Sequence, residues 1–270
     1  MSSLPLGKEI ENTGNYTPSL LCAIERRDAR DAASVPEPLP FLGEDVWNCY
    51  ELTWLDTQGM PQISGVRIQA PCSTPCIVES KSLKLYLNSF AQTQFASRSD
   101  VMNTLDSDLS VNFRAPVMVS LLGLDQLGNA ADQFPGICLD ELDIATHYYD
   151  VNSSLLTMDD SEVHVHETLF THLFRSICPV TGQPDLASVM VEYSGSPINQ
   201  ASLLKYLVSY RNHPAFHEAT IEQIFVDIKR ICQPDQLTVY GRFLRRGGID
   251  INPFRSTQDG AASQIRLSRQ

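Results

Sequence analysis

A nine-residue segment occurs twice in this chain, and this repeat constrains the fold more than any other feature. Residues 82–90 read SLKLYLNSF and residues 202–210 read SLLKYLVSY, with the same residue at five positions. Each copy is followed by a polar break and then by a second amphipathic helical pattern. Internal repetition of this kind indicates that one structural unit was duplicated within the chain. We therefore expect two similar units.

Both halves of the chain show the same predicted order of elements, β-β-α-α-β-β. Alternation of apolar and polar residues predicts the strands, and apolar residues spaced three to four apart predict the helices. In the first half we expect strands at residues 45–55, 62–69, 116–124 and 133–144, and helices at about 80–95 and 99–109. In the second half we expect strands at residues 163–176, 187–193, 237–244 and 249–253, and helices at about 200–210 and 218–231. Asn199 is the expected N-cap of the helix at 200–210.

The predicted fold class is α+β, with tandem duplicated units whose antiparallel sheets are each backed by a helix pair. Residues 1–40 are polar and proline-bearing, and they are expected to form an N-terminal arm with little structure of its own. Residues 41–150 are expected to form the first unit and residues 151–270 the second. Because clefts form between copies of a duplicated unit, a binding site is expected there.

The composition favours a globular protein that handles small molecules. Apolar residues make up 43% of the chain, and the formal net charge is −12. Basic residues are scattered, apart from the pairs Arg26–Arg27 and Arg245–Arg246, so direct nucleic-acid binding, which needs a basic face, is not expected. No apolar run is long enough for a membrane span, and the start does not resemble a signal peptide. The seven cysteines follow no framework spacing, so we expect reduced thiols in a cytoplasmic protein.

A loop at residues 176–185 (SICPVTGQPD) holds a thiol and a carboxylate, Cys178 and Asp185, seven residues apart. Its prolines and glycine turn the chain sharply, which can place both groups over one pocket. A thiolate is a nucleophile, and a nearby acid can protonate what the thiolate attacks. The alternative at this point is structural, with Cys178 as a small buried side chain in a turn.

A second polar cluster, Glu79, Ser80 and Lys81, stands directly before a predicted helix. Ser80 or Ser82 is the expected N-cap, which would put Glu79 at the helix start. The chain has no Gly-x-Gly-x-x-Gly motif, so a Rossmann nucleotide site is excluded. Lys81 and the loop RRGG at residues 245–248 could hold phosphate groups through charge and open backbone N–H groups. No metal is expected, since Cys72 and Cys76 lack a second pair of ligands.

Four motifs in order resemble the NADPH-dependent 7-cyano-7-deazaguanine reductases, the nitrile reductases of queuosine biosynthesis. They are ESKSLKLY at residues 79–86, SICPVTGQPD at 176–185, FHE at 216–218 and RRGGIDINP at 245–253. The resemblance extends from about Leu39 to Gln270 and is to the long, two-unit form of the family. Pro179 departs from the expected pattern, because it removes a backbone N–H next to the cysteine.

The resemblance implies a duplicated tunnelling fold, a homodimer and NADPH as cofactor. It implies that Cys178 adds to the nitrile carbon and that Asp185 donates the proton. Its implied contacts to the deazaguanine come from Glu79, from the backbone of Val78 and Ser80, and from His217 and Glu218. Its implied contacts to NADPH come from Ser80, Lys81, Arg246 and Gly247. The product would be 7-aminomethyl-7-deazaguanine, a free base later used in tRNA modification.

The implied chemistry agrees with what the residues can do. A thiolate that adds to a nitrile gives a thioimide, whose C=N bond accepts hydride more readily, so one hard step becomes two easier ones. Two hydrides then give the primary amine, which requires two NADPH and no metal. A carboxylate can accept the two adjacent N–H donors of a guanine-like edge, as Glu79 and Glu218 are placed to do, and Phe216 can cover the ring face.

Two other functions fit the same residues. The first is a cysteine-dependent hydrolase or cyclohydrolase acting on a purine-like substrate, with Cys178 as nucleophile and His217 as base. Cyclohydrolases of this type need zinc ligands, and the His and Cys clusters here are poor. The second is a purine-binding scaffold on the same fold, in which Cys178 is inert. Oxidation of NADPH in the presence of the nitrile distinguishes the three.

Overall fold

The computed structural model describes residues 15–123, 126 and 132–270. These residues form two compact units, each assembled from separate stretches of the chain. Unit 1 comprises the described residues of 1–27, 45–130 and 245–250, and unit 2 comprises those of 28–44, 131–244 and 251–270. The units therefore interleave along the sequence, whereas the sequence predicted a contiguous division at residue 150.

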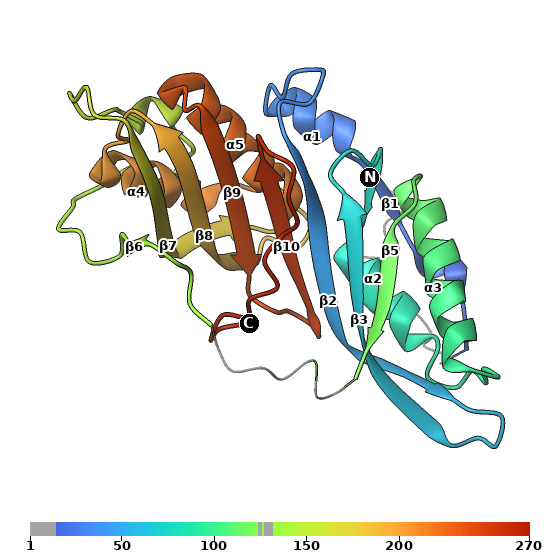
Figure 1. Cartoon of the computed structure of the whole chain (residues 1–270). Coiled ribbons are helices and arrows are strands. Elements are labelled where there is room, and N and C mark those ends of the chain that lie inside the picture. Colours follow the sequence, from blue (N-terminus) through green and yellow to red (C-terminus); the bar gives the residue numbers. More distant parts are fainter. Residues whose placement is uncertain (1–14, 124–125, 127–131) are drawn as a thin grey trace. The chain divides into compact units, whose positions relative to one another are not determined.

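Unit 1 is a small antiparallel sheet with two helices (Figure 1). Its sheet has the order β5-β3-β2, with β2 at Leu42–Leu55, β3 at Pro61–Pro71 and β5 at Met118–Leu122. β5 runs antiparallel to β3, with Gly65 opposite Leu122. The helices are α2 (Ser80–Asn88) and α3 (Arg98–Phe113), and a second, two-stranded sheet joins β1 (Ala23–Glu25) to β4 (Cys76–Val78).

The helices of unit 1 bury one face each. On α3 the buried side chains recur every four residues, at Val101, Leu105, Leu109 and Phe113, which is the period of one helix face. Phe113 meets Trp47 of β2 edge to face, with ring centroids 6.4 Å apart. This apolar contact fixes α3 against the strands, as the helical spacing in the sequence predicted.

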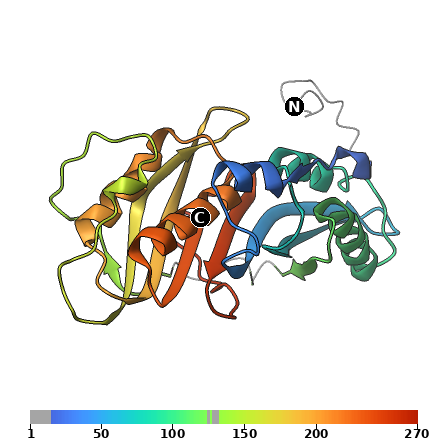
Figure 2. The ribbon, with the colours of Figure 1, turned by 90° about the horizontal axis from the view of Figure 1, so that it is seen from above.

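Unit 2 is a larger sheet of the order β10-β9-β8-β7-β6, backed by two helices (Figure 2). Its strands are β6 (Ile137–Cys138), β7 (Val165–Ile177), β8 (Pro184–Gly195), β9 (Gln236–Phe243) and β10 (Ile249–Ser256). The helices are α4 (Gln200–Ser209) and α5 (His217–Cys232), and α1 (Arg26–Ala32) precedes β2. β7, β8, β9 and β10 pair antiparallel in turn, whereas β6 pairs parallel with β7.

The strand expected at residues 133–144 differs from the prediction. It shrinks to the two residues of β6, and it pairs with β7 in unit 2 instead of completing the sheet of unit 1. The cause is apolar burial, because Leu139 is fully buried and Phe134 packs on Phe170 and Tyr240. Within the described residues, unit 1 therefore lacks the sixth element of the predicted order.

The segment expected to be an arm with little structure of its own contains three short regular elements in its described part. Residues 1–14 of that segment lie outside the described residues, and the remainder forms a 3-10 turn (Pro18–Leu20), β1 and α1. Arg26 is buried and forms an ion pair of 2.5 Å with the buried Asp45. Arg30 binds both oxygens of Glu222, at 2.8 and 2.9 Å. These charged contacts stabilise the segment, and hydrophobic periodicity does not reveal them.

The repeated segment forms the first helix of each pair, and its first serine makes the same contact in both. Ser82 Oγ donates to the Glu79 carbonyl at 2.6 Å, and Ser202 Oγ donates to the Asn199 carbonyl at 2.8 Å. Each hydroxyl also accepts a backbone N–H at 3.1 Å from an extended segment earlier in the chain, from Cys22 and Thr157 respectively.

The tyrosine of the repeat is used identically as well. The Tyr86 hydroxyl donates to Asp108 at 2.6 Å, and the Tyr206 hydroxyl donates to Asp227 at 2.8 Å. Both acceptors lie on the second helix of their pair. Within each helix pair, an equivalent tyrosine–aspartate hydrogen bond therefore links the first helix to the second.

α2 ends at Asn88, not near residue 95 as predicted. Ser89 closes the helix by donating its hydroxyl to the Tyr86 carbonyl at 2.6 Å, and such a local bond competes with further helix. Phe90 and Phe95, which gave the appearance of a longer apolar stripe, stack on each other with centroids 5.3 Å apart. In the part of the chain described, no helix has the length and apolar character that crossing a membrane requires.

Candidate active site

The loop that carries Cys178 is a closed hairpin connection between β7 and β8. The Cys178 backbone N–H donates to the Gln183 carbonyl at 2.8 Å, and the Gly182 N–H donates to the Cys178 carbonyl at 3.0 Å. Gly182 has φ +68°, a conformation that favours glycine. Pro179 lacks an N–H, but these bonds use the backbone groups of Cys178 itself. The partly exposed Cys178 thiol thus stands on a defined turn.

Asp185 is the second residue of β8 and lies directly opposite Ser176 of β7. Directly opposite residues in an antiparallel pair share one face of the sheet, and Cys178 lies in the loop that begins two residues after Ser176. The Asp185 side chain is only 3% exposed. The strand pairing therefore holds Asp185 at the base of the cysteine loop.

The start of α5 is brought to the same place by pairing with the end of β7. The Ile177 N–H donates to the His213 carbonyl at 2.9 Å, and the Ala215 N–H donates to the Ile177 carbonyl at 3.2 Å. Ile177 is the residue before Cys178, and α5 begins two residues after Ala215. His217 and Glu218 consequently lie in the first turn of a helix that starts beside the cysteine loop.

His217 is held in a single orientation by an aromatic stack and a carboxylate. Its ring lies on the Phe243 ring with centroids 3.9 Å apart and planes 14° apart. Its Nε2 lies 3.2 Å from Asp185 Oδ2. Among the described residues, the buried Nδ1 of His217 has no hydrogen-bond partner. A buried polar atom in this state is a candidate contact for a ligand.

Glu218 and Phe216 complete this group of residues. Glu218 is 3% exposed and lies in the first turn of α5, where the helix dipole stabilises a negative charge. Phe216 is the N-cap residue, makes no side-chain capping bond and is half-buried. Unit 2 therefore brings together five of the residues proposed from the sequence: Cys178, Asp185, Phe216, His217 and Glu218.

In unit 1, Glu79 is itself the N-cap of α2, so the expectation of Ser80 or Ser82 is wrong. Its Oε1 accepts the Lys81 N–H at 3.0 Å and its Oε2 accepts the Ser82 N–H at 2.7 Å. Glutamate can reach both donors because Glu79 has extended backbone, with φ −65° and ψ 128°. The side chains of Glu79 and Val78 are both buried.

Arg246 and Gly247 form a tight turn between β9 and β10. Backbone bonds of 2.9 and 3.1 Å close the turn between Arg246 and Ile249, and Gly247 and Gly248 have φ +57° and +77°. Two successive positive φ values characterise a type I′ turn, which needs glycine or asparagine. The double glycine of the sequence motif thus has a conformational reason.

Lys84 belongs to the same region and was missed by sequence reasoning. A Cβ built on Gly247 would lie 3.0 Å from Lys84 Nζ, so this side chain lies against the turn. Lys84 follows Lys81 by three residues on α2, and Arg245 stacks over the Tyr50 ring at 4.5 Å. The exposed cations here, in a chain of net charge −12, suit a phosphate-bearing ligand. They are Lys81, Lys84, Arg245 and Arg246.

Phe243 was also missed as a site residue. The sequence indicates only that residues 237–244 form a strand. The register that sets Phe243 opposite Ala187 places its ring on the face that Asp185 shares. No sequence pattern indicates this position, because a phenylalanine in a strand usually belongs to the hydrophobic core.

Comparisons with known proteins agree with the motifs. The family model described as nitrile reductase, 7-cyano-7-deazaguanine-reductase N-term, matches residues 12–121, and the model described as QueF-like protein matches residues 184–262. An NADPH-dependent 7-cyano-7-deazaguanine reductase of Paraburkholderia phytofirmans is 47% identical over 268 residues, covering 98% of each chain. One of Burkholderia mallei is 49% identical over 253 residues, covering 93% of this chain and 92% of the relative.

A solved structure of the archaeosine synthase QueF-Like in its apo form aligns with 37% of this chain and with 100% of its own. The identity is 21% and the TM-score is 0.32.

Proposed function

The chain belongs to the family of NADPH-dependent 7-cyano-7-deazaguanine reductases, and from this premise we propose that Cys178 reduces the nitrile through a covalent thioimide. The activity is the four-electron reduction of a nitrile in queuosine biosynthesis. The observation that carries the proposed mechanism is the placement of Cys178 on a closed hairpin turn, at whose base the buried Asp185 pairs with Ser176. A nucleophile and an acid are thereby held on one rigid element.

Cys178 begins the reaction as a thiolate. Its sulfur forms a bond to the nitrile carbon, one π bond of the C≡N group breaks, and the nitrogen takes a proton, which leaves a thioimide. NADPH, when bound, would supply the two hydrides that this carbon needs. The carbon–sulfur bond breaks between the two reductions and returns the thiolate to Cys178, and the nitrogen takes a second proton to become a primary amine.

Asp185 is the proposed proton donor for the nitrile nitrogen. A general acid must carry a proton when the thiolate adds, and Asp185 is the carboxyl group that strand pairing holds beside the cysteine loop. The nearby His217 Nε2, at 3.2 Å, can share or replace that proton as charge develops. The stack on Phe243 keeps the imidazole in reach of the carboxyl group.

The deazaguanine edge is proposed to bind Glu218 and Glu79. A carboxylate can accept the N1 and exocyclic amine protons in a bidentate pair. Each Glu79 oxygen already accepts one backbone N–H, but a carboxylate has about four acceptor positions in all. The His217 Nδ1 and the backbone of Val78 and Ser80 are further polar contacts, and Phe216 covers the ring.

NADPH is proposed to bind Ser80, Lys81, Arg246 and Gly247. The donor set fits a phosphate-bearing cofactor, since exposed cations and the Gly247 turn lie in one unit together with the start of α2. Lys84 is an additional candidate because its side chain lies against Gly247. These groups bind and orient the cofactor by charge and backbone N–H donation, without a Rossmann motif.

We also propose that the α+β fold is a tandem duplication of the tunnelling fold. Support comes from the equivalent hydrogen bonds of Ser82 and Ser202 and of Tyr86 and Tyr206. Following the resemblance, we expect a cytoplasmic homodimer that acts on the free deazapurine and binds no tRNA. Light scattering after size-exclusion chromatography tests the dimer.

The function is tested by following NADPH oxidation with 7-cyano-7-deazaguanine as substrate. The expected result is two NADPH oxidised per nitrile, with no oxidation in Cys178→Ala and unchanged oxidation in the control Cys138→Ala, which removes an exposed thiol. Product formed without NADPH would favour a hydrolase, and binding without turnover would favour a scaffold. Either result would contradict the proposal.

A further inference from the structure

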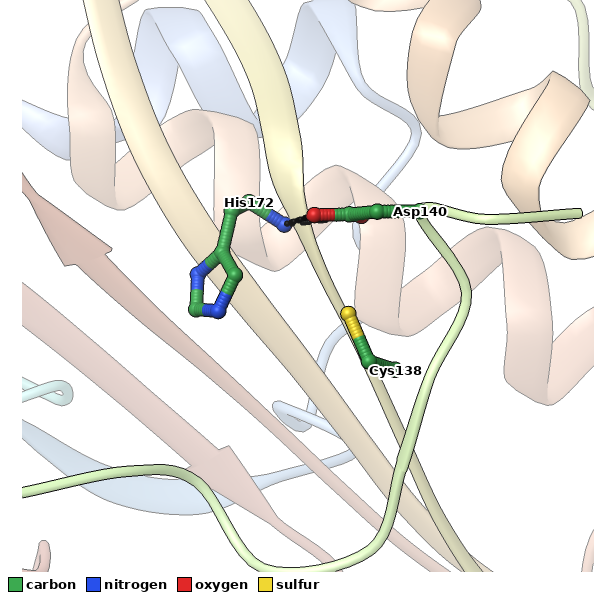
Figure 3. Close-up of side chains that lie close together, drawn as sticks. All are labelled: Cys138, Asp140 and His172. Atoms are coloured by element: carbon green, nitrogen blue, oxygen red, sulfur yellow. Dashed lines mark hydrogen bonds between the residues drawn. The ribbon is translucent and has the colours of Figure 1, made fainter.

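Three side chains with metal-binding atoms meet at the edge of the unit 2 sheet, away from the residues proposed for the reductase. They are Cys138, Asp140 and His172, and one ligand atom from each lies within 4.8 Å of the others. Figure 3 shows the Asp140 carboxylate at the backbone N–H of His172, with the His172 imidazole and the Cys138 thiol below it in this view. We name this group the edge cluster.

Strand register explains why these residues converge. β6 pairs parallel with β7, and Cys138 lies opposite Phe170. Two residues further along both segments, Asp140 reaches His172, whose backbone N–H donates to the carboxylate at 3.1 Å (Figure 3). Pairing with β7 therefore brings one ligand atom each of Cys138, Asp140 and His172 within 4.8 Å of one another.

We propose that the edge cluster binds a zinc ion and ties residues 138–140 to strand β7. Thiolate, imidazole and carboxylate are the ligand types zinc takes, and three protein ligands leave a fourth position for water. Ligand atoms on a tetrahedral zinc ion lie about 3.3–3.8 Å apart, given metal–ligand distances of about 2.0–2.3 Å. A rotation of the exposed Cys138 side chain can close the remaining gap.

The surroundings orient two of the three ligands. His172 Nδ1 bonds to Ser188 Oγ at 2.7 Å, which leaves Nε2 as the metal-binding atom. Asp140 Oδ1 accepts the Thr171 hydroxyl at 2.5 Å. Partners of this kind fix the ring and the carboxylate of metal sites, and they raise affinity for the ion. Such an ion would reinforce an element that otherwise consists of a two-residue strand.

The test uses cobalt(II) as a spectroscopic probe on the chelator-treated full-length chain. Cobalt bound to a thiolate absorbs in the near ultraviolet, so one equivalent should produce this band in the unaltered chain. We expect the band to be lost in Cys138→Ser and retained in Cys178→Ser. A band that survives Cys138→Ser, a band lost in Cys178→Ser, or no band at all would overturn the proposal.

Zinc affinity measured by calorimetry gives a second, graded readout. Asp140→Asn and His172→Gln should weaken binding by 10-fold or more, and Ser188→Ala, which only orients the ring, by about 10-fold. The control His166→Gln, an exposed histidine on the same strand, should leave affinity unchanged. Equal affinity in His172→Gln and His166→Gln would contradict the site. NADPH oxidation by Cys138→Ser reports separately that the fold and the reductase site are intact.

Discussion

Single residues in this molecule combine a structural role with a proposed chemical one, and Glu79 is the clearest case. Its carboxylate caps α2 through two backbone N–H groups, and the same carboxylate is the proposed ligand of the deazaguanine. Asp185 and His217 are similar, since the strand pairing and the Phe243 stack that hold them also belong to the core of unit 2. Substitutions at such positions change stability and activity, so each needs a matched control.

Glu79→Ala should lower both stability and substrate affinity. Loss of an N-cap costs about 0.5–2 kcal/mol, measured by urea unfolding. The matched control is Asn199→Ala, because Asn199 caps α4 through the Ser202 N–H at 2.9 Å. The control should lose similar stability and keep its affinity for the nitrile in calorimetry. Equal affinity in the two variants would remove Glu79 from the substrate site.

Asp185→Asn should lower kcat by about 10²–10⁴-fold, the usual contribution of a general acid. Asparagine keeps the shape and can still accept a hydrogen bond from His217, but it cannot donate an acidic proton. Steady-state kinetics should show the loss mainly in kcat. If kcat stays within threefold of that of the unaltered enzyme, a group other than Asp185 donates the proton to the nitrile nitrogen.

At the scale of elements, periodicity predicted most of the architecture. The expected strands and helices of unit 2 are all present, and Asn199 caps α4 as predicted. The predictions of elements were wrong where tertiary contacts outweighed hydrophobic periodicity. β6 pairs with β7 of unit 2, not with unit 1, because Leu139 is buried there. α1, which was not predicted, is stabilised by the ion pair of Arg30 with Glu222.

The candidate site was predictable only in part, for a related reason. Cys178, Asp185 and the start of α5 carry motifs that a sequence can display. The positions of Lys84, against the Gly247 turn, and of Phe243, opposite Ala187, depend on tertiary contacts, although Lys84 lies within the motif at residues 79–86. Contacts created by tertiary folding leave no local signal.

Residues 213–215, which precede α5 and pair with Ile177 at the end of β7, should make the stability of the fold sensitive to acid. Burial lowers the pKa of His213, whose carbonyl bonds to the Ile177 N–H. The folded state therefore binds fewer protons than the unfolded state, in which a histidine has a pKa of about 6.5. Stability contributed by neutral His213 is present above that pH and is lost as the pH falls toward the lowered folded value.

The corresponding measurement is urea unfolding at pH 7.5 and at pH 5.5. His213→Gln should lose less stability over this interval than the unaltered chain. An identical loss in both would show that His213 is not the responsible group.

At the scale of the whole molecule, the two copies of the nine-residue repeat make matching hydrogen bonds, on which the proposed duplication rests. Tyr86→Phe and Tyr206→Phe each delete one hydroxyl that donates to a carboxylate, on Asp108 and Asp227 respectively. Each should destabilise by about 1.5–3 kcal/mol, the range for hydrogen bonds to charged groups. Thermal and urea unfolding of both variants checks this. If only one of the two variants loses stability, the two helix pairs are not equivalent.

The acidic character of the molecule bears on its partners. With a net charge of −12, the chain offers cations at a few places, such as Lys81 and Arg246, rather than over a face. This pattern agrees with a phosphate-bearing cofactor and a neutral, flat substrate better than with a nucleic acid.

The central claim, that Cys178 attacks a nitrile, is tested most directly by intact mass spectrometry of the protein with 7-cyano-7-deazaguanine and no NADPH. Addition without reduction should raise the mass by that of one whole substrate molecule, and peptide mapping should place the adduct on Cys178. Cys178→Ala should show no adduct, while Cys138→Ala should show it in full. An adduct on another residue, or none in the unaltered chain under conditions where NADPH oxidation is observed, would contradict the thioimide mechanism.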